Sequence, residues 1–97
     1  MPLVLREEGP RYCPRIVCDH CGTEIARAAD GNYQWRAADG PMMMYFTHKR
    51  CCRAFEAAQD DGRGWMAIDL TALPYYLANN LKVSWKESRA VGTLCAR

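Results

Sequence analysis

Two pairs of metal-binding side chains constrain this chain more than any other feature of its sequence. Cys18 and Cys21 stand two residues apart and are followed by Gly22. The pair His48 and Cys51 repeats that spacing after a gap of 26 residues. Two intervening residues let the chain turn tightly enough for both sulfurs to reach one tetrahedral ion, and Gly22 admits the backbone conformation that follows. The sequence therefore predicts one structural Zn²⁺ site with a Cys₃His ligand set: Cys18, Cys21, His48 and Cys51.

The second pair is expected at the start of a helix. Thr47 can cap a helix that begins at His48, and apolar residues then recur at three- and four-residue spacing as far as Ala58. The step from His48 to Cys51 puts both ligands on one side of the first turn, where the positive end of the helix favours thiolate. Soft sulfur ligands select zinc over magnesium or calcium, and four protein ligands leave no position for water. We therefore expect a structural metal.

The order of knuckle, hairpin and ligand pair at a helix start resembles the treble-clef family of zinc fingers over residues 18–59. This resemblance implies a type of finger and no named function. A zinc ribbon would need a second knuckle on a hairpin, and the helix-forming residues 55–58 argue against one. The first half of a LIM domain shares the Cys-x2-Cys…His-x2-Cys order, but the further cysteine knuckle that a LIM domain needs does not follow.

The expected fold is one α+β domain spanning residues 1–97: a small treble-clef-like zinc finger of knuckle, β-hairpin or meander, and helix, with two C-terminal helices completing the core. Residues 1–17 read as an N-terminal arm that prolines and a glycine interrupt. Residues 18–59 form the finger, and residues 65–97 a C-terminal strand and helical hairpin. A chain this short buries a modest core, so a metal would supply a large share of its stability.

Within the finger, residues 23–47 are expected to form strands joined by tight turns. The dipeptides at 30–31 and 39–40 are both Asp-Gly, and glycine supplies the positive φ that hairpin turns need. The apolar run at 42–46 predicts a buried strand whose three methionines fill the core.

The C-terminal third predicts a strand followed by two helices. Residues 66–70 alternate as in a strand, and Thr71 is the expected cap of the first helix. Ser84 with Glu87 has the form of a capping box that starts the second helix.

Residues 71–95 also resemble a DNA-reading helix-turn-helix. Lys82 departs from that family where its turn usually has glycine, and Ser88 departs where the second helix usually buries an aliphatic side chain. An ordinary helical hairpin packed on the finger is the competing interpretation.

Other residues could compete for the metal or carry redox chemistry. Cys52 neighbours Cys51 but points about 100° further round the helix, so we expect a small buried thiol. His20 lies inside the knuckle and is expected to face solvent. Cys13 is interpreted as an unpaired thiol near the surface, with a redox or second-site ligand role as the alternative. Cys95 is expected to be a core thiol of the last helix.

These residues do not compose an enzyme signature. Thiol–disulfide exchange by a Cys-x-x-Cys pair needs a thioredoxin-like context and would leave His48 and Cys51 unexplained. Nucleases of the His-metal type need a histidine free to activate water, whereas His48 is assigned to the metal and His20 has no acidic partner at a suggestive spacing. We expect no enzymatic activity and identify no small-molecule substrate. An enzyme that uses Cys13 or His20 is the weakest alternative.

Charge leaves the choice of partner open. The net charge of +2 neither demands nor excludes a polyanion. Lys49, Arg50 and Arg53 surround the expected helix start and, with Arg27 and Arg36, are candidate phosphate-binding residues. A solvated surface explains them equally well. The first hypothesis is a small nucleic-acid-binding or regulatory factor; the alternative is a protein-interaction adaptor or dimerisation module of phage or mobile-element type that presents aromatic residues.

The chain is expected to be cytoplasmic and to have no membrane partner. Its first apolar stretch is too short for a signal-peptide core, and no run approaches the ~20 apolar residues of a membrane span. Six cysteines in the cytoplasm indicate metal binding or thiol chemistry, with a disulfide-stapled secreted domain as the alternative.

Overall fold

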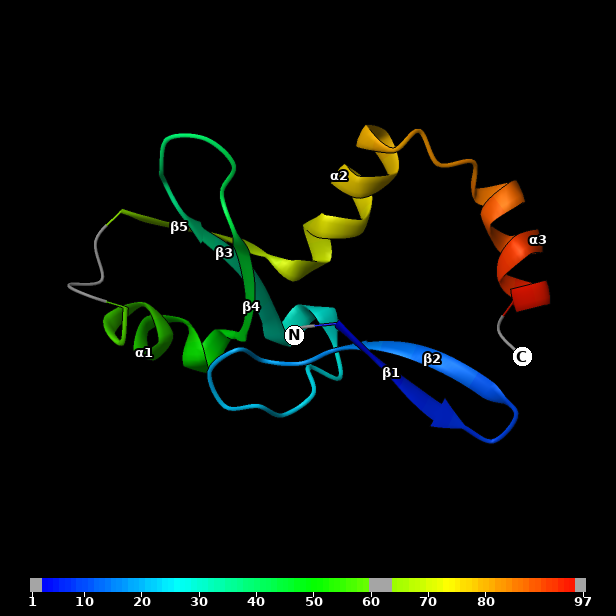
Figure 1. Ribbon diagram of the computed structural model, residues 1–97, viewed down its shortest axis with the longest axis horizontal. Helices are drawn as coiled ribbons and strands as arrows, with labels where there is room; N and C mark the ends of the chain where they lie inside the picture. Colours follow the sequence, from blue (N-terminus) through cyan, green and yellow to red (C-terminus); the bar gives the residue numbers. More distant parts are fainter. Residues whose placement is uncertain (1–2, 60–63, 96–97) are drawn as a thin grey trace.

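The computed structural model describes the backbone of residues 3–59 and 64–95, and side chains as far as residue 92. The elements of this part of the chain are shown in Figure 1. They are β1 (Leu3–Glu8), β2 (Arg11–Ile16), η1 (Ala28–Asp30), β3 (Gly31–Arg36), β4 (Met44–His48), η2 (Lys49–Cys51), α1 (Cys52–Ala57), β5 (Trp65–Asp69), η3 (Leu70–Ala72), α2 (Leu73–Asn80) and α3 (Trp85–Cys95), where η marks a 3-10 turn. Two sheets and three helices confirm the α+β class.

A three-stranded antiparallel sheet in the order β4-β3-β5 forms the centre of the fold. Tyr33 of β3 lies opposite Phe46 of β4 and Ile68 of β5, so these three side chains share one face. Because side chains alternate along a strand, Gln34 projects from the other face. Strand β5 confirms the strand expected at residues 66–70.

The two faces of the sheet are covered by different parts of the chain. The first face carries the main core, whose buried members include two of the predicted metal ligands: Cys18, Ile25, Tyr33, Phe46, Cys51, Leu70 and Leu73. The second face is covered by α1, whose Phe55 lies 5.2 Å from Tyr45 and 5.7 Å from Trp65 between ring centroids. The metal ligands are therefore part of the core rather than an appendage to it.

The expected N-terminal arm is in fact a regular hairpin. Strands β1 and β2 pair antiparallel from Leu3 opposite Ile16 to Glu8 opposite Arg11. Gly9 takes the positive φ of 62° that the turn needs. Pro14 lies inside β2, opposite Leu5. A proline is tolerated there because each strand of a two-stranded ribbon has an open edge on which no ladder donor is required.

The two Asp-Gly dipeptides behave differently. Gly40 has a φ of 82° and turns the β3–β4 loop, as expected. Gly31 was expected in a tight turn but is the extended first residue of β3, with a φ of −126°. A Cβ at Gly31 would lie 3.0 Å from side-chain carbons of both Ile25 and Leu70, so close packing requires this glycine.

The methionine run is not core filler. Met42 and Met43 lie in the β3–β4 loop, before β4 begins, and are 50% and 70% exposed. Met44 begins β4 but is also exposed. The buried part of the strand lies further on, where Phe46 and His48 contribute to the first face, so apolar character alone misplaced the strand by two residues.

Two helix starts also differ from the sequence-based expectation. His48 ends β4 instead of beginning a helix, and a 3-10 turn separates it from α1. Thr47 caps nothing, because its hydroxyl hydrogen-bonds the side-chain oxygen of Gln34. At the other start, Thr71 lies inside the 3-10 turn η3 that precedes α2, and Asp69 caps this turn by accepting from the N–H of Thr71 at 2.9 Å.

The C-terminal helices do not complete the core as expected. Helix α2 contributes Leu73, but every residue from Leu81 to Gly92 is exposed, including all the described side chains of α3. The radius of gyration is 15.2 Å, against about 12–13 Å for a compact domain of this length. Figure 1 shows α2 and α3 extending from one side of the sheet and the β1–β2 hairpin from below it, with open space between them. In the described part of the chain, no helix has the length and apolar character to cross a membrane.

Candidate metal centre

The four predicted ligands converge in the fold. One sulfur or ring-nitrogen atom from each of Cys18, Cys21, His48 and Cys51 lies within 4.8 Å of all the others. Ligands about 2.3 Å from a tetrahedral ion are spaced somewhat more closely than that, so the cluster needs only a small contraction to hold one. It is the one such group of histidine, cysteine and acidic residues found among the described residues.

The knuckle is built by a short network of backbone hydrogen bonds. Gly22 has a φ of 76° and donates its N–H to the carbonyl of Cys18 at 3.0 Å. Cys18 donates in turn to the carbonyl of Thr23 at 2.9 Å. The N–H groups of Cys21 and His48 point at the buried sulfur of Cys18, at 3.5 and 3.4 Å. These contacts fix the position of the Cys18 sulfur between the knuckle and the end of β4.

His48 is oriented through both ring nitrogens. Its Nδ1 lies 3.4 Å from the sulfur of Cys21, and its Nε2 lies 3.2 Å from the backbone carbonyl of Glu24. With Nδ1 in the ligand group, the proton belongs on Nε2, which then donates to Glu24. A hydrogen bond on the far nitrogen of a metal-binding histidine fixes the tautomer and the ring orientation.

Without metal, the pKa values of two thiols in the cluster are shifted in opposite directions from the ordinary value for cysteine. The hydroxyl and the backbone N–H of Thr23, together with neighbouring cluster residues, lower the pKa of Cys21 to about 6. Burial, together with the nearby sulfur of Cys18, raises the pKa of Cys51 to about 11. Three sulfurs this close cannot all ionise cheaply without a cation, which is what a divalent ion would supply.

Sequence reasoning missed the residues that support the ligands. Asp19 fastens the knuckle to β4, because its N–H donates to the carbonyl of Phe46 at 2.7 Å and its carboxylate accepts from the N–H of Phe46 at 2.8 Å. Thr23 and Glu24 act on Cys21 and His48 as described above. A small polar residue between the two cysteines and another just after the knuckle glycine were the available signals.

The remaining described cysteines and His20 lie outside the cluster. Cys52 is half-buried and its sulfur lies 3.4 Å from the carboxylate of Glu56, while burial raises its pKa. Cys13 is half-buried in β2, and a hydrogen bond to Glu8 raises its pKa. His20 is exposed. None of the cysteines with a described side chain forms a disulfide, and the side chain of Cys95 lies outside the described residues.

A buried polar network holds α1 in place behind the ligands. Gln34 is fully buried, and its amide nitrogen lies 3.1 Å from the carboxylate of Glu56 and 3.5 Å from the carbonyl of Cys52. Its amide oxygen accepts the hydroxyl of Thr47. Because a buried polar group is costly unless it is paired, this network fixes where the helix after Cys51 can lie.

Two of the five candidate phosphate-binding residues lie apart on the sheet. Arg36 and Lys49 lie toward opposite ends of β3, because Arg36 pairs with Trp65 whereas His48, next to Lys49, pairs with Gly31. Lys49 binds Asp69 at 2.6 Å, and this ion pair lowers the pKa of Asp69. The other three residues are exposed: Arg27, Arg50 and Arg53.

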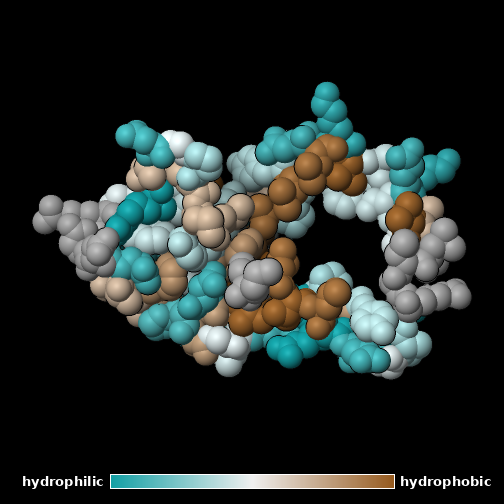
Figure 2. All heavy atoms as spheres, in the orientation of Figure 1, coloured by the Kyte–Doolittle hydropathy of each residue, from teal (hydrophilic) through white to brown (hydrophobic). Residues whose placement is uncertain are grey.

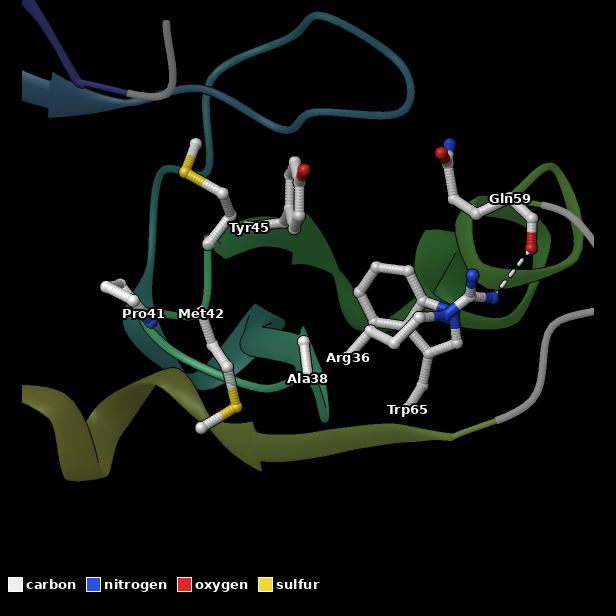
Figure 3. A pocket seen from close by; sticks show the side chains of 8 residues that line it. Arg36, Ala38, Pro41, Met42, Tyr45, Gln59 and Trp65 are labelled. Atoms are coloured by element: carbon white, nitrogen blue, oxygen red, sulfur yellow. Dashed lines mark hydrogen bonds between the residues drawn. The ribbon is translucent and has the colours of Figure 1, made fainter.

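Arg36 is engaged in a small depression beside the second face of the sheet. Its guanidinium lies 5.1 Å from the ring centre of Trp65 and donates to the carbonyl of Gln59 at 2.9 Å (Figure 3). Met42 and Tyr45 line the same depression, whose volume is about 280 Å³. That volume lies at the lower limit of ligand pockets, which span about 300–1,000 Å³. We assign it no ligand.

Comparison with protein-family models, with curated proteins and with solved structures finds no match to this chain. The geometry of the site therefore stands on its own residues. It shows a Cys₃His cluster, able to hold a metal ion, in a small mixed α+β fold.

Proposed function

We propose that this chain is a non-enzymatic binding protein whose fold is held together by a structural Zn²⁺ ion in a finger of the treble-clef type. One observation carries the proposal: four ligand atoms from two distant segments lie within 4.8 Å of one another. The order of elements also supports it, since a knuckle, the β3–β4 hairpin and a helical turn follow one another along the chain. Free thiols at the site favour a reducing compartment, so the proposal places the protein in the cytoplasm.

The character of the ligands favours zinc in a structural role. Three sulfurs and one imidazole suit a soft or borderline ion, and four protein ligands complete a tetrahedron without water. Cys18, Cys51 and His48 are buried and only Cys21 is exposed, so solvent reaches the cluster from one side. The raised pKa of Cys52 argues against that thiol as a nucleophile at neutral pH.

Metal analysis tests this proposal with a matched pair of variants. The purified protein should contain one zinc per chain, and cobalt in its place should give the absorption of a tetrahedral thiolate site. Cys51→Ser should lose the metal, because serine is a poor ligand for zinc. Cys52→Ser, one residue further, should keep it. A metal-free wild-type protein, or equal metal loss in both variants, would contradict the proposal.

The surface favours a protein partner as the object of binding. Large apolar side chains are exposed on β1 and from α2 to α3, and the most exposed of them are Leu3, Leu5, Tyr75, Leu81, Trp85 and Val91. Exposed apolar surface on this scale marks an interaction site more often than a free surface. We therefore place the protein-interaction role ahead of the nucleic-acid role.

Nucleic-acid binding stays as a second candidate because Arg50 and Arg53 are exposed beside the metal-bearing turn. If this surface binds phosphates, Arg50→Glu with Arg53→Glu should abolish a gel shift at low salt, and added salt should weaken the wild-type shift steeply. Lys86→Glu on α3 is the control for a change of surface charge. Absence of any shift at low salt would remove this candidate.

A further inference from the structure

We propose that this chain forms a two-fold dimer in which helix α3 of each copy lies in an apolar groove of the other. The groove is the hollow between α2 and the β1–β2 hairpin, and we assign its walls to the exposed leucines of these two segments: Leu3 and Leu5 of β1, Leu77 of α2, and Leu81 at the C-cap of α2. These side chains are 58%, 68%, 44% and 70% exposed. Figure 2 shows apolar atoms along α2 and along the start of the hairpin, on two sides of a hollow. The inference deepens the proposed protein-interaction role and rests on it.

The exposed apolar area is close to what a stable dimer needs. Seven large side chains of the groove and of the segment from Leu81 to Val91 are exposed by 36% to 70%: Leu3, Leu5, Leu77, Leu81, Val83, Trp85 and Val91. At about 100 Å² for each half-exposed large side chain, they present on the order of 700 Å². A standard specific interface buries about 800 Å² per partner. The single chain thus leaves uncovered nearly as much apolar surface as an interface needs.

Helix α3 has a face suited to close packing, and within the described part of the chain its side chains stay exposed. Ser88 follows Trp85 by three residues, and Val91 and Gly92 follow Ser88 by three and four, so all four lie on one side of the helix. Lys86 lies on the opposite side. A helix-interior glycine costs about 1 kcal/mol relative to alanine. A Cβ at Gly92 would meet no atom within 4 Å, so this chain alone gives no reason for the glycine.

The connection between α2 and α3 is capped at both of its ends. Helix α2 ends in a Schellman motif: Val83 donates to the carbonyl of Ala78 at 2.9 Å and Lys82 to that of Asn79 at 3.4 Å, with Lys82 at a φ of 54°. Ser84, the next residue after Val83, is the N-cap of α3, and its hydroxyl accepts a hydrogen bond from the N–H of Glu87 at 3.3 Å.

With both caps in place, every described side chain of α3 is exposed, so α3 does not pack along α2 of its own chain. A second copy can supply the same helix, and the exchange is reciprocal, as two-fold symmetry requires. The groove and the helix are thus two halves of one interface that the chain in this conformation leaves open.

Light scattering and sedimentation of the zinc-loaded full chain, in reducing buffer and over a range of micromolar concentrations, test the dimer. We expect a species of twice the 11.0 kDa chain mass. Leu81→Asp in the groove and Val91→Asp on α3 should each weaken the dimer by about tenfold or more. Gly92→Leu should weaken it as well, although leucine is the better helix former. Met43→Asp, equally exposed but in the β3–β4 loop, should leave it unchanged.

A mixing experiment separates exchange of α3 from any other association. Leu81→Asp and Val91→Asp chains each damage both halves of their own dimer. A heterodimer of the two pairs one intact groove with one intact helix, so mixing should restore part of the dimer. If mixing restored no dimer, the proposal that the two copies exchange α3 would be wrong.

Three further results would overturn the proposal: a monomer at every concentration, a monomer that scattering shows to be compact, or a dimer indifferent to Leu81→Asp and Val91→Asp. A monomer at every concentration would mean that the groove binds a different protein. A compact monomer would mean that α3 packs in the groove of its own chain. Zinc is measured in the same samples, so a monomer that keeps its zinc overturns the dimer alone and leaves the finger standing.

Discussion

Cys21 and Cys51 enter metal binding from opposite protonation states. Near pH 7 the thiol of Cys21, with a pKa of about 6, is mostly ionised, whereas the thiol of Cys51, with a pKa of about 11, carries its proton. Zinc must displace that proton. Between roughly pH 7 and 9, the apparent zinc affinity should therefore rise by about tenfold per pH unit for each proton that binding releases. Below pH 6 the affinity should depend on pH more steeply, because Cys21 is protonated as well.

Competition with a zinc chelator at several pH values, corrected for the protonation of the chelator, measures this slope. A zinc affinity that does not change with pH would mean that all three sulfurs are already ionised without metal, contrary to the burial of Cys51.

Gly31 offers a test of packing at a single residue. Its φ of −126° is open to any residue, so the backbone alone would favour alanine over glycine. An alanine Cβ at this position would lie only 3.0 Å from side-chain carbons of Ile25 and Leu70, which disfavours alanine. We expect Gly31→Ala to lower the free energy of unfolding by about 1–3 kcal/mol in urea titrations. The loss should shrink in an Ile25→Ala background, which removes one of the two close contacts. A stabilising Gly31→Ala would show that the core can shift to admit the methyl group.

At the scale of elements, the end of α2 contains a strained residue. Lys82 occupies a left-handed conformation that costs a side-chain-bearing residue about 1–2 kcal/mol and that glycine adopts freely. Lys82→Gly should therefore raise the free energy of unfolding by about 1 kcal/mol. Lys86→Gly, the same change inside α3, should lower it by about as much, because glycine is a poor helix residue. Thermal melts followed by circular dichroism compare the two, and the same sign for both would refute the Schellman geometry.

The elements also show which parts of this fold the sequence could predict. The metal cluster and β5 follow from local spacing, since two residues between ligands and an alternating apolar pattern carry their own geometry. The position of Lys82, where a helix-turn-helix usually has glycine, was visible in the same way. The expected start of α3 at Ser84 was correct because a hydroxyl that accepts from Glu87 is also a local feature.

The predictions from sequence were wrong where contacts between residues far apart in the sequence determine the structure. Gly31 looked like a turn residue, but Ile25 and Leu70 determine its role. The three methionines looked like core, but the pairing of Phe46 with Tyr33 sets where β4 lies. Pro14 seemed to exclude a strand, although an outer edge tolerates it. Asp19, Thr23 and Glu24 support the ligands through contacts that no spacing encodes.

On the scale of the whole molecule, the proposed Zn²⁺ would join the knuckle to the end of β4, which the hydrogen bonds between Asp19 and Phe46 already hold together. The apparent free energy of structural zinc binding, about 10–16 kcal/mol, is comparable to the whole stability of a small domain. Chelation should therefore disorder the knuckle and release it from β4, with loss of the near-ultraviolet circular dichroism signal. Zinc should restore that signal, whereas magnesium or calcium should not, because both prefer oxygen ligands. A native spectrum after complete zinc removal would mean that the apolar core suffices.

Glu24 joins the two halves of the molecule through different atoms. Its carbonyl faces Nε2 of His48, while its carboxylate lies 3.7 and 3.9 Å from the guanidinium groups of Arg6 and Arg15 in the hairpin. Its backbone also bridges to Val17 at the end of that hairpin. A minimal finger without the first sixteen residues would keep all four ligands and Glu24, but would lose the two arginines that hold the carboxylate of Glu24. We expect the shortened peptide to take up zinc and to release it faster, because the residue that orients the imidazole is held less firmly.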